Sequence, residues 1–337
     1  MSESGNGSSA TARSAGKALV AALIFPLFMA LALPGVYLYA FHQPQPHEMP
    51  VEIIGANHDS AQLALGLATK MAPSFRVTSV ADADTARRHL TDMSSRGAFD
   101  PATGTLYVAS AGSPLAESAV QTAFGAVARQ LGTELTVRDV APLPESDRVG
   151  VSLLFVGLAA ILAGFVTATV LNVAVPGLSL RAEIAILGLV ALVAAVITTF
   201  IAYSAYGALS GHLVEVALLA ASGTICAGLL QSGGIKLIGP GMTVVGVTVL
   251  IILGIPASGI AVPVDMVPPV FAHLHSWLPT SAVLDGLRRT LYFGGSGIDA
   301  DLPIIGLWIA LGAGAFWLST LRSPKTSAVV AEQEGAR

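Results

Sequence analysis

The sequence predicts an α-helical polytopic membrane protein of six transmembrane helices, with a small inserted α/β domain and a re-entrant or interfacial segment before the last helix. First, the 337 residues are 53% hydrophobic and only 11% charged, whereas ordinary soluble domains are roughly 25% charged. Second, six apolar stretches are long enough for the roughly 20 helical residues that cross a hydrocarbon core of about 30 Å. Third, one block of ordinary composition, at 43–148, separates the first stretch from the second.

The first span follows Arg13 and Lys17, as the core of a signal peptide would, but it is longer than such a core and contains Pro26 and Pro34. It is therefore expected to remain in the protein as a transmembrane helix within 17–42. The six expected spans are 18–41, 149–171, 184–206, 212–231, 237–260 and 302–321. Spans two to five thus fill the region 149–260, and the sixth fills 302–322.

Basic residues predict that both termini lie on the cytoplasmic side, because short cytoplasmic loops are enriched in Lys and Arg. With the N-terminus inside, the short outside loops contain only Arg288 and Arg289. The inside segments then contain Arg13, Lys17, Arg181, Lys236, Arg322, Lys325 and Arg337. The block at 43–148 is therefore expected outside, as an extracytoplasmic domain. The tails at 1–16 and 323–337 have little to bury, and we expect both to be disordered.

The block at 43–148 predicts a small α/β domain with a largely parallel sheet, because strand-like and helix-like segments alternate along it. Strands are expected at 51–56, 75–80, 105–110 and 134–140, and helices at 59–71, 82–95 and 114–131. The proline-rich stretches 43–50 and 141–147 are expected to be stiff linkers. About 100 residues are enough to form one core.

Little in this domain indicates chemistry. Its eight Lys and Arg against twelve Asp and Glu argue against nucleic acid as a partner. Asp59 is expected to be the N-cap of the first helix rather than part of an active-site turn with Asn57 and His58. The run from Arg87 to His89 is expected to form a solvated helix face.

The chain lacks the motifs of nucleotide-binding proteins and common hydrolases. It contains no GxxxxGK[ST], since SAGKA and QSGGIKLIG both depart from that spacing, and it contains neither HExxH nor GxSxG. The single cysteine, Cys226, allows neither an intrachain disulfide nor a Cys-based zinc site. The sequence therefore predicts a protein that is not an enzyme and has no cofactor, metal or ATP site of its own.

Two groups of ionisable residues lie near the predicted spans. His212 and Glu215, near the outer end of the fourth span, are a candidate polar site at membrane level, because ionisable groups at that depth are often functional; a snorkelling pair at the interface is the alternative. His273, His275 and Asp265 resemble a metal cluster only loosely, since residues two apart do not share a helix face. An interfacial loop is the simpler interpretation of those three residues.

The region 261–301 is too broken by proline and glycine to span the membrane and too apolar to lie in water. We expect it on the outer side, either dipping into the membrane or lying at its surface as a lid or vestibule. Within it, helical spacing separates an apolar face from polar residues, as in an interfacial amphipathic helix. The apolar residues are Val283, Leu287 and Leu291, and the polar ones are Asp285, Arg288 and Arg289.

In this same region, LGIPASG and VPVDMVPPVFAHLHSWLPTSAVLDGLRRTLYFGG resemble the C-terminal part of ABC-2-type permeases of the YhgE/Pip branch. VEIIGANHDS, SVADADTARRHL and VRDVAPLPESDRVG are similar to the extracytoplasmic domain of that branch. The resemblance covers about 40–325. It implies a multi-pass protein of the bacterial plasma membrane, working as a homodimer that exports an apolar or amphipathic substrate with energy from a separate ATP-binding subunit.

The resemblance also implies roles for particular residues. The segment with Asn172, Arg181 and Glu183 would couple to the ATPase. The outward gate would include Pro263, Asp265, Pro279, Asp285, Arg288, Arg289 and Tyr292. Because this branch includes proteins with no assigned ATPase, an alternative stays open. In that alternative the chain is an ATPase-independent scaffold or receptor, whose extracytoplasmic domain binds a protein or a cell-envelope partner.

Overall fold

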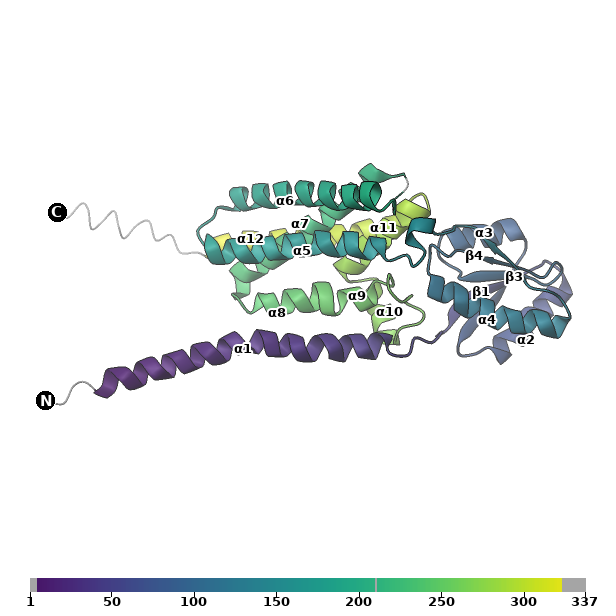
Figure 1. The fold of residues 1–337 in the computed structure, drawn as a ribbon, viewed down its shortest axis with the longest axis horizontal. Coiled ribbons are helices and arrows are strands. Elements are labelled where there is room, and N and C mark those ends of the chain that lie inside the picture. The colour runs from purple at the N-terminus through teal and green to yellow at the C-terminus, as the bar shows by residue number, and fades with distance from the viewer. Residues whose placement is uncertain (1–4, 210, 323–337) are drawn as a thin grey trace.

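The computed structural model describes residues 5–209 and 211–322, so the expected tail 323–337 and residues 1–4 lie outside the described part. Long helices run side by side, and an α/β domain lies at one end of them (Figure 1). The start of α1 (Gly5–Phe41) and the end of α12 (Asp301–Arg322) both lie at the opposite end. α1 begins at Gly5, within the segment predicted to be a disordered tail.

Within the described residues, five helical segments are long and apolar enough to cross a membrane: Leu23–Phe41, Ser152–Ala174, Leu180–Ala205, Leu213–Ile238 and Ile298–Leu321. These segments belong to α1, α5 (Ser152–Ala174), α6 (Leu180–Phe200) with the π-helical turn Ile201–Ala205, α7 (Leu213–Ile238) and α12. Their number suggests a multi-pass membrane protein, in agreement with the prediction at this coarser level.

The stretch predicted as the fifth span, 237–260, has a different structure. Its apolar helix, Met242–Ala257, is shorter than the other five. It consists of α8 (Met242–Val247), a π-helical turn at Thr248–Ile252 and α9 (Gly254–Ala257). The chain then turns through 258–268 and forms two more helices, α10 (Pro269–His275) and α11 (Pro279–Tyr292), each starting with a proline in its first turn.

The helical bundle packs around α7, which contacts α5, α6, α11 and α12. Glycine allows the closest approach, since a Cβ on Gly164 of α5 would clash with the carbonyl of Thr224 on α7. The Thr224 hydroxyl donates a hydrogen bond to the Ala160 carbonyl, 2.8 Å away. Small residues and hydroxyl groups at such contacts are the usual means of packing helices in lipid.

The α/β domain contains a five-stranded mixed sheet in the order β2-β1-β3-β4-β5. Its strands are β1 (Met49–Ile54), β2 (Phe75–Val80), β3 (Gly97–Asp100), β4 (Thr105–Val108) and β5 (Thr136–Asp139). β1 pairs in parallel with β2 and β3, and β4 pairs in parallel with β5, but β3 and β4 form an antiparallel hairpin. The sheet is therefore largely parallel, as predicted, with three of its four strand pairings parallel. The prediction missed the antiparallel pairing at the centre, because it lacked the four-residue strand β3.

Helices cover both faces of this sheet. On one face, Val51 and Ile53 of β1 pack with Phe99 and with Phe124 of α4 (Pro114–Leu131), and residues of α2 (His58–Lys70) join the same cluster. On the other face, Ile54 packs against Ala86 and Leu90 of α3 (Ala83–Thr91). Successive residues of a strand point to opposite faces, so β1 contributes to both clusters.

The helix caps also differ from the prediction at one position. The cap of α2 is Asn57, whose side-chain oxygen accepts a hydrogen bond from the Ser60 amide at 2.8 Å. Asp59 lies inside the first turn, where its charge still suits the positive end of the helix dipole. Asp82 and Ser113 cap α3 and α4 in the same way as Asn57.

Candidate functional site

α11 carries the polar residues of the region 261–301 into the interior of the protein. It packs against α5, α7 and α12, and both Asp285 and Arg288 are about 95% buried, at 4% and 5% exposure. The polar side of α11 is therefore buried inside the protein, which the amphipathic spacing did not predict. Its polar side is covered by the loop after α9 and by the α/β domain, neither of which the spacing of residues along α11 could reveal.

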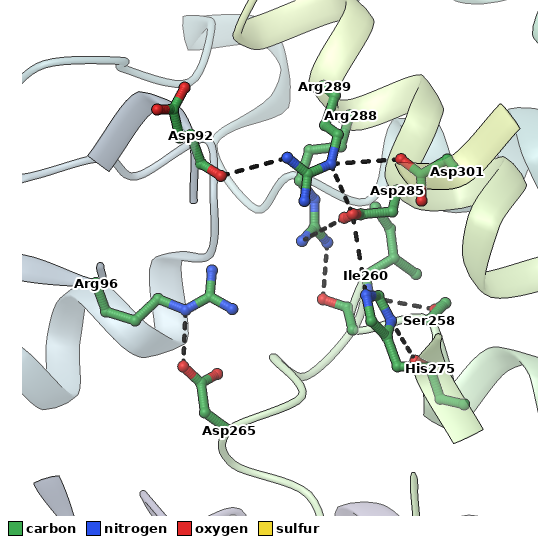
Figure 2. Close-up of polar contacts among 12 residues, drawn as sticks. Asp92, Arg96, Ser258, Ile260, Asp265, His275, Asp285, Arg288, Arg289 and Asp301 are labelled. Carbon is green, nitrogen blue, oxygen red and sulfur yellow. Dashed lines mark hydrogen bonds and ion pairs between the residues drawn. The ribbon is translucent and has the colours of Figure 1, made fainter. Parts of the chain in front are cut away.

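Arg289 lies at the centre of this polar cluster (Figure 2). Its Nε donates a hydrogen bond to Asp285 Oδ2 at 2.9 Å and lies 3.4 Å from Asp301 Oδ2, at the start of α12. Its Nη1 donates to the backbone carbonyls of Asp92, at 3.3 Å, and Ser296, at 3.2 Å. A single guanidinium group thus connects α11 and α12 with the α/β domain.

A second ion pair connects the α/β domain to the loop after α9. Arg96, immediately before β3, donates a hydrogen bond from Nε to Asp265 Oδ2 at 2.7 Å, and the two side chains are 12% and 10% exposed. The carbonyl of Asp265 also accepts a hydrogen bond from the His47 amide at 2.8 Å. Charge-assisted hydrogen bonds of this length are stronger than neutral ones, so this contact helps to hold the domain on the bundle.

Arg288 has weaker partners than its neighbour. Its Nη2 donates to the Gly259 carbonyl at 2.7 Å, and Nη1 lies 4.0 Å from Asp285 Oδ1. Burial lowers the pKa of Arg288 to about 10, and the nearby Asp285 only partly opposes this effect. Burial also acts to lower the pKa of Arg96, but its close contact with Asp265 leaves that pKa above the ordinary value. The pKa values of the two arginines shift in opposite directions because Arg288 lacks the close carboxylate that Arg96 has.

These residues surround a polar cavity of about 120 Å³, called the junction cavity below. Its charged or titratable lining residues are Arg96, His275, Asp285, Arg288 and Arg289. His275 makes a 2.9 Å hydrogen bond through Nδ1 to the Ala257 carbonyl. Because a carbonyl only accepts, Nδ1 carries the hydrogen, and Nε2 lies 4.0 Å from Asp285 Oδ2.

The remaining gate residues frame this cavity without lining it. Pro263 is buried in the turn that precedes Asp265, and its carbonyl accepts a hydrogen bond from the Met266 amide at 2.8 Å. Pro279 is the first residue of α11 and Tyr292 the last. The predicted gate residues thus belong to one continuous structural unit between α9 and α12.

The predicted coupling residues lie near the other end of the bundle and form a different arrangement. Glu183, at 1% exposure, lies 3.1 Å from Lys236 Nζ and accepts hydrogen bonds from Asn172, at 3.1 Å, and from Ser232. Arg181, by contrast, is exposed. Asn172 and Glu183 thus join α5, α6 and α7 internally, and only Arg181 of the three predicted residues is clearly accessible from outside.

His212 and Glu215 form a half-exposed pair at the start of α7, with 3.8 Å between Nδ1 and Oε1. They lie at the mouth of an apolar groove of about 480 Å³ between α7 and α12, which also includes Leu219, Leu302 and Ile305. A second apolar groove, of about 470 Å³, lies between α5 and α6 and ends at Ser146 and Asp147. Both grooves are lined mainly by apolar side chains, with a few polar ones among them.

The solvated face predicted for 87–89 is only partly correct. Arg87 is half-exposed, pairs with Asp84 at 2.8 Å and lies over the ring of Tyr107. His89, however, makes a 2.6 Å hydrogen bond to Glu52, which is 8% exposed in the middle of β1. His89 therefore supplies the partner of a buried carboxylate.

The sequence did not reveal three of the residues that complete the site: Asp92, Arg96 and Asp301. Arg96 precedes the short strand β3, which has too few residues to show a period, and Asp92 contributes a backbone carbonyl. Asp301 appears in the sequence only as an acidic residue at the start of a span. The one available signal was the concentration of charge in 285–301 within an otherwise apolar region.

Comparisons with protein-family models, with curated proteins and with solved structures give no match. The fold and the site together therefore define the class of protein only broadly. It is a multi-pass membrane protein, to judge from the five long apolar helices of its described part. A small mixed α/β domain is attached through the Arg96–Asp265 ion pair and the hydrogen bond from Arg289 to the Asp92 carbonyl.

Proposed function

We propose that this chain is the membrane-spanning subunit of an export-type permease, which moves an apolar or amphipathic molecule outward with energy from a separate ATPase. The observation that carries the proposal is the interrupted apolar helix Met242–Ala257, followed by α11 with its buried charges. Discontinuous helices are a recurring feature of transporter substrate paths. Ionisable residues enclosed among membrane helices also favour a functional role over a purely structural one.

The chemical character of the grooves supports an apolar or amphipathic substrate. Each groove, between α5 and α6 and between α7 and α12, is lined mainly by apolar side chains together with a few polar ones. Volumes near 470 and 480 Å³ fall within the range of about 300–1,000 Å³ that is typical of small-molecule sites. The resemblance of 40–325 to ABC-2-type permeases also supports the proposal, and the separate ATPase is inferred from that resemblance.

Arg181 is the best residue for testing whether a separate ATPase couples to this chain. It is exposed at the start of α6, whereas Glu183 is buried in a hydrogen-bond network. The full chain is purified from its own membranes, any co-purifying ATP-binding protein is identified, and its ATP hydrolysis is measured. We expect Arg181→Ala to lower this hydrolysis roughly two- to five-fold, the effect of losing one exposed ionic contact.

The matched control is Arg138→Ala, which removes an exposed arginine from β5 of the α/β domain. We expect this variant to hydrolyse ATP at the wild-type rate. If no ATP-binding protein accompanies the chain under conditions that preserve other membrane complexes, the ATPase-driven proposal fails. The scaffold or receptor, acting through the α/β domain, then becomes the better explanation.

A further inference from the structure

The junction cavity contains more positive than negative charge. Arg96, Arg288 and Arg289 line it, but Asp285 is the only carboxylate among its lining residues. Asp265 and Asp301 lie outside the lining and pair with Arg96 and Arg289, respectively. In the described part of the chain, Arg288 alone of the three arginines lacks a close carboxylate, since Asp285 Oδ1 lies 4.0 Å from its Nη1. Because a buried charge without a close partner is strongly destabilising, a counter-ion in the cavity would stabilise Arg288.

Two of these guanidinium groups, those of Arg96 and Arg288, each have several N–H donors. Arg96 uses Nε for Asp265, and Arg288 uses Nη2 for the Gly259 carbonyl. Within residues 5–209 and 211–322, no hydrogen bond occupies the remaining donors of these two groups. Figure 2 shows that both side chains extend toward the same central region, Arg96 from the α/β domain and Arg288 from α11.

We propose that the junction cavity binds a phosphate group, held between the guanidinium groups of Arg96 and Arg288. Its volume of about 120 Å³ exceeds the roughly 30 Å³ that one water molecule occupies in the liquid. A tetrahedral phosphate accepts hydrogen bonds from several directions at once. The parallel N–H groups of an arginine guanidinium can bind two of its oxygens together. A planar carboxylate, with two oxygens, satisfies donors that approach from opposite sides less well.

The phosphate belongs either to free inorganic phosphate or to the headgroup of a phospholipid. The lining residues come both from the α/β domain and from α11, so the cavity lies where the helical bundle meets the domain. Basic pockets between membrane helices bind lipid headgroups in other proteins, there on the cytoplasmic or matrix side. In both cases the bound group connects α11 to the α/β domain. This inference goes beyond the proposed function, because it requires no ATPase and no transported substrate.

The test uses the full chain in a maltoside detergent, which contains no phosphate, and measures the midpoint of thermal unfolding. One arm adds inorganic phosphate at constant ionic strength. The other arm adds dioleoyl phosphatidylglycerol, compared with a glucosyl diacylglycerol of the same acyl chains. We expect a saturable rise in the midpoint of about 2–5 °C in at least one arm. Protection by inorganic phosphate identifies a free anion, and protection by phosphatidylglycerol alone identifies a headgroup.

The variants assign this protection to the cavity. Arg288→Gln and Arg96→Gln should abolish it, whereas Arg138→Gln, on the exposed side of β5, should retain it. If the glutamine variants do not fold, Arg288→Lys and Arg96→Lys replace them. Lysine keeps the positive charge but lacks the paired N–H donors of a guanidinium group, so we expect these variants to bind phosphate about tenfold more weakly. The proposal is overturned if neither arm protects, or if protection is equal in all variants and does not saturate, since that is a general salt effect.

Discussion

At the scale of single residues, the most consequential feature is that Arg288 is buried without a close carboxylate among the described residues, whereas Arg96 and Arg289 each have one. Asp285 is the key acid, because it hydrogen-bonds Arg289 and is also the carboxylate closest to the Arg288 guanidinium. Desolvating a charge is costly, and a pair in the interior offsets that cost only while both partners are present. Removing Asp285 therefore affects two buried cations at once.

We predict that Asp285→Asn lowers the free energy of unfolding by about 3 kcal/mol, the lower end of the cost of breaking a buried ion pair. The measurement is chemical unfolding of the full chain in detergent micelles. Asp299→Asn, an exposed acid in the short turn before α12, is the matched control and should change stability by less than about 0.5 kcal/mol. If Asp285→Asn changes the free energy of unfolding as little as Asp299→Asn does, the ion pairs of Asp285 contribute no net stability.

At the scale of elements, the close packing of α5 on α7 depends on the absence of a side chain at Gly164. A Cβ at this position would meet the Thr224 carbonyl and lie 2.9 Å from the Gly228 amide nitrogen. Backbone atoms in two long helices cannot yield as a flexible side chain can. The helices would therefore have to separate.

Accordingly, Gly164→Ala should destabilise the bundle by about 1–3 kcal/mol, the usual cost of overpacking. Gly188→Ala in α6 is the control, because a Cβ there meets nothing within 4 Å. That substitution should be neutral or stabilise the helix by up to about 1 kcal/mol. Thermal unfolding of both variants in the same detergent makes the comparison, and a harmless Gly164→Ala would contradict the observed helix contact.

At the scale of the whole molecule, the α/β domain occupies one end of the bundle, and the loop between α5 and α6 lies at the other end (Figure 1). If the long helices span a bilayer, these two ends lie on opposite sides of it. The basic residues of the sequence predict that the α/β domain is the external one. The direction of export in the proposed function depends on this orientation.

Cysteine labelling in intact cells tests the orientation, with the buried Cys226 replaced by alanine. Cysteine at Ser118, exposed on α4, should react with a membrane-impermeant reagent before lysis. Cysteine at Arg181 should react only after lysis. The reverse pattern would place the α/β domain in the cytoplasm and remove the support for outward transport.

The sequence by itself determined the locations of most helices and strands. α4 coincides with the predicted helix 114–131, and β2 with the predicted strand 75–80, because periodicity and capping residues are local properties. It also determined that long stretches suit lipid, since that follows from composition and length alone. The fifth predicted span, 237–260, illustrates the limit of this reasoning, because apolarity does not reveal the π-helical turn and the shortened helix at Met242–Ala257.

Only the tertiary structure decided how these elements meet. It placed β3 beside β4 in an antiparallel hairpin, and it covered the polar side of α11 with the α/β domain. Arg96 and Asp265 are 169 positions apart in the chain, and Arg289 and Asp92 are 197 positions apart. No local pattern encodes such pairs, because the free energy of burying a charge depends on which distant group supplies its partner. The junction cavity is a product of those distant contacts.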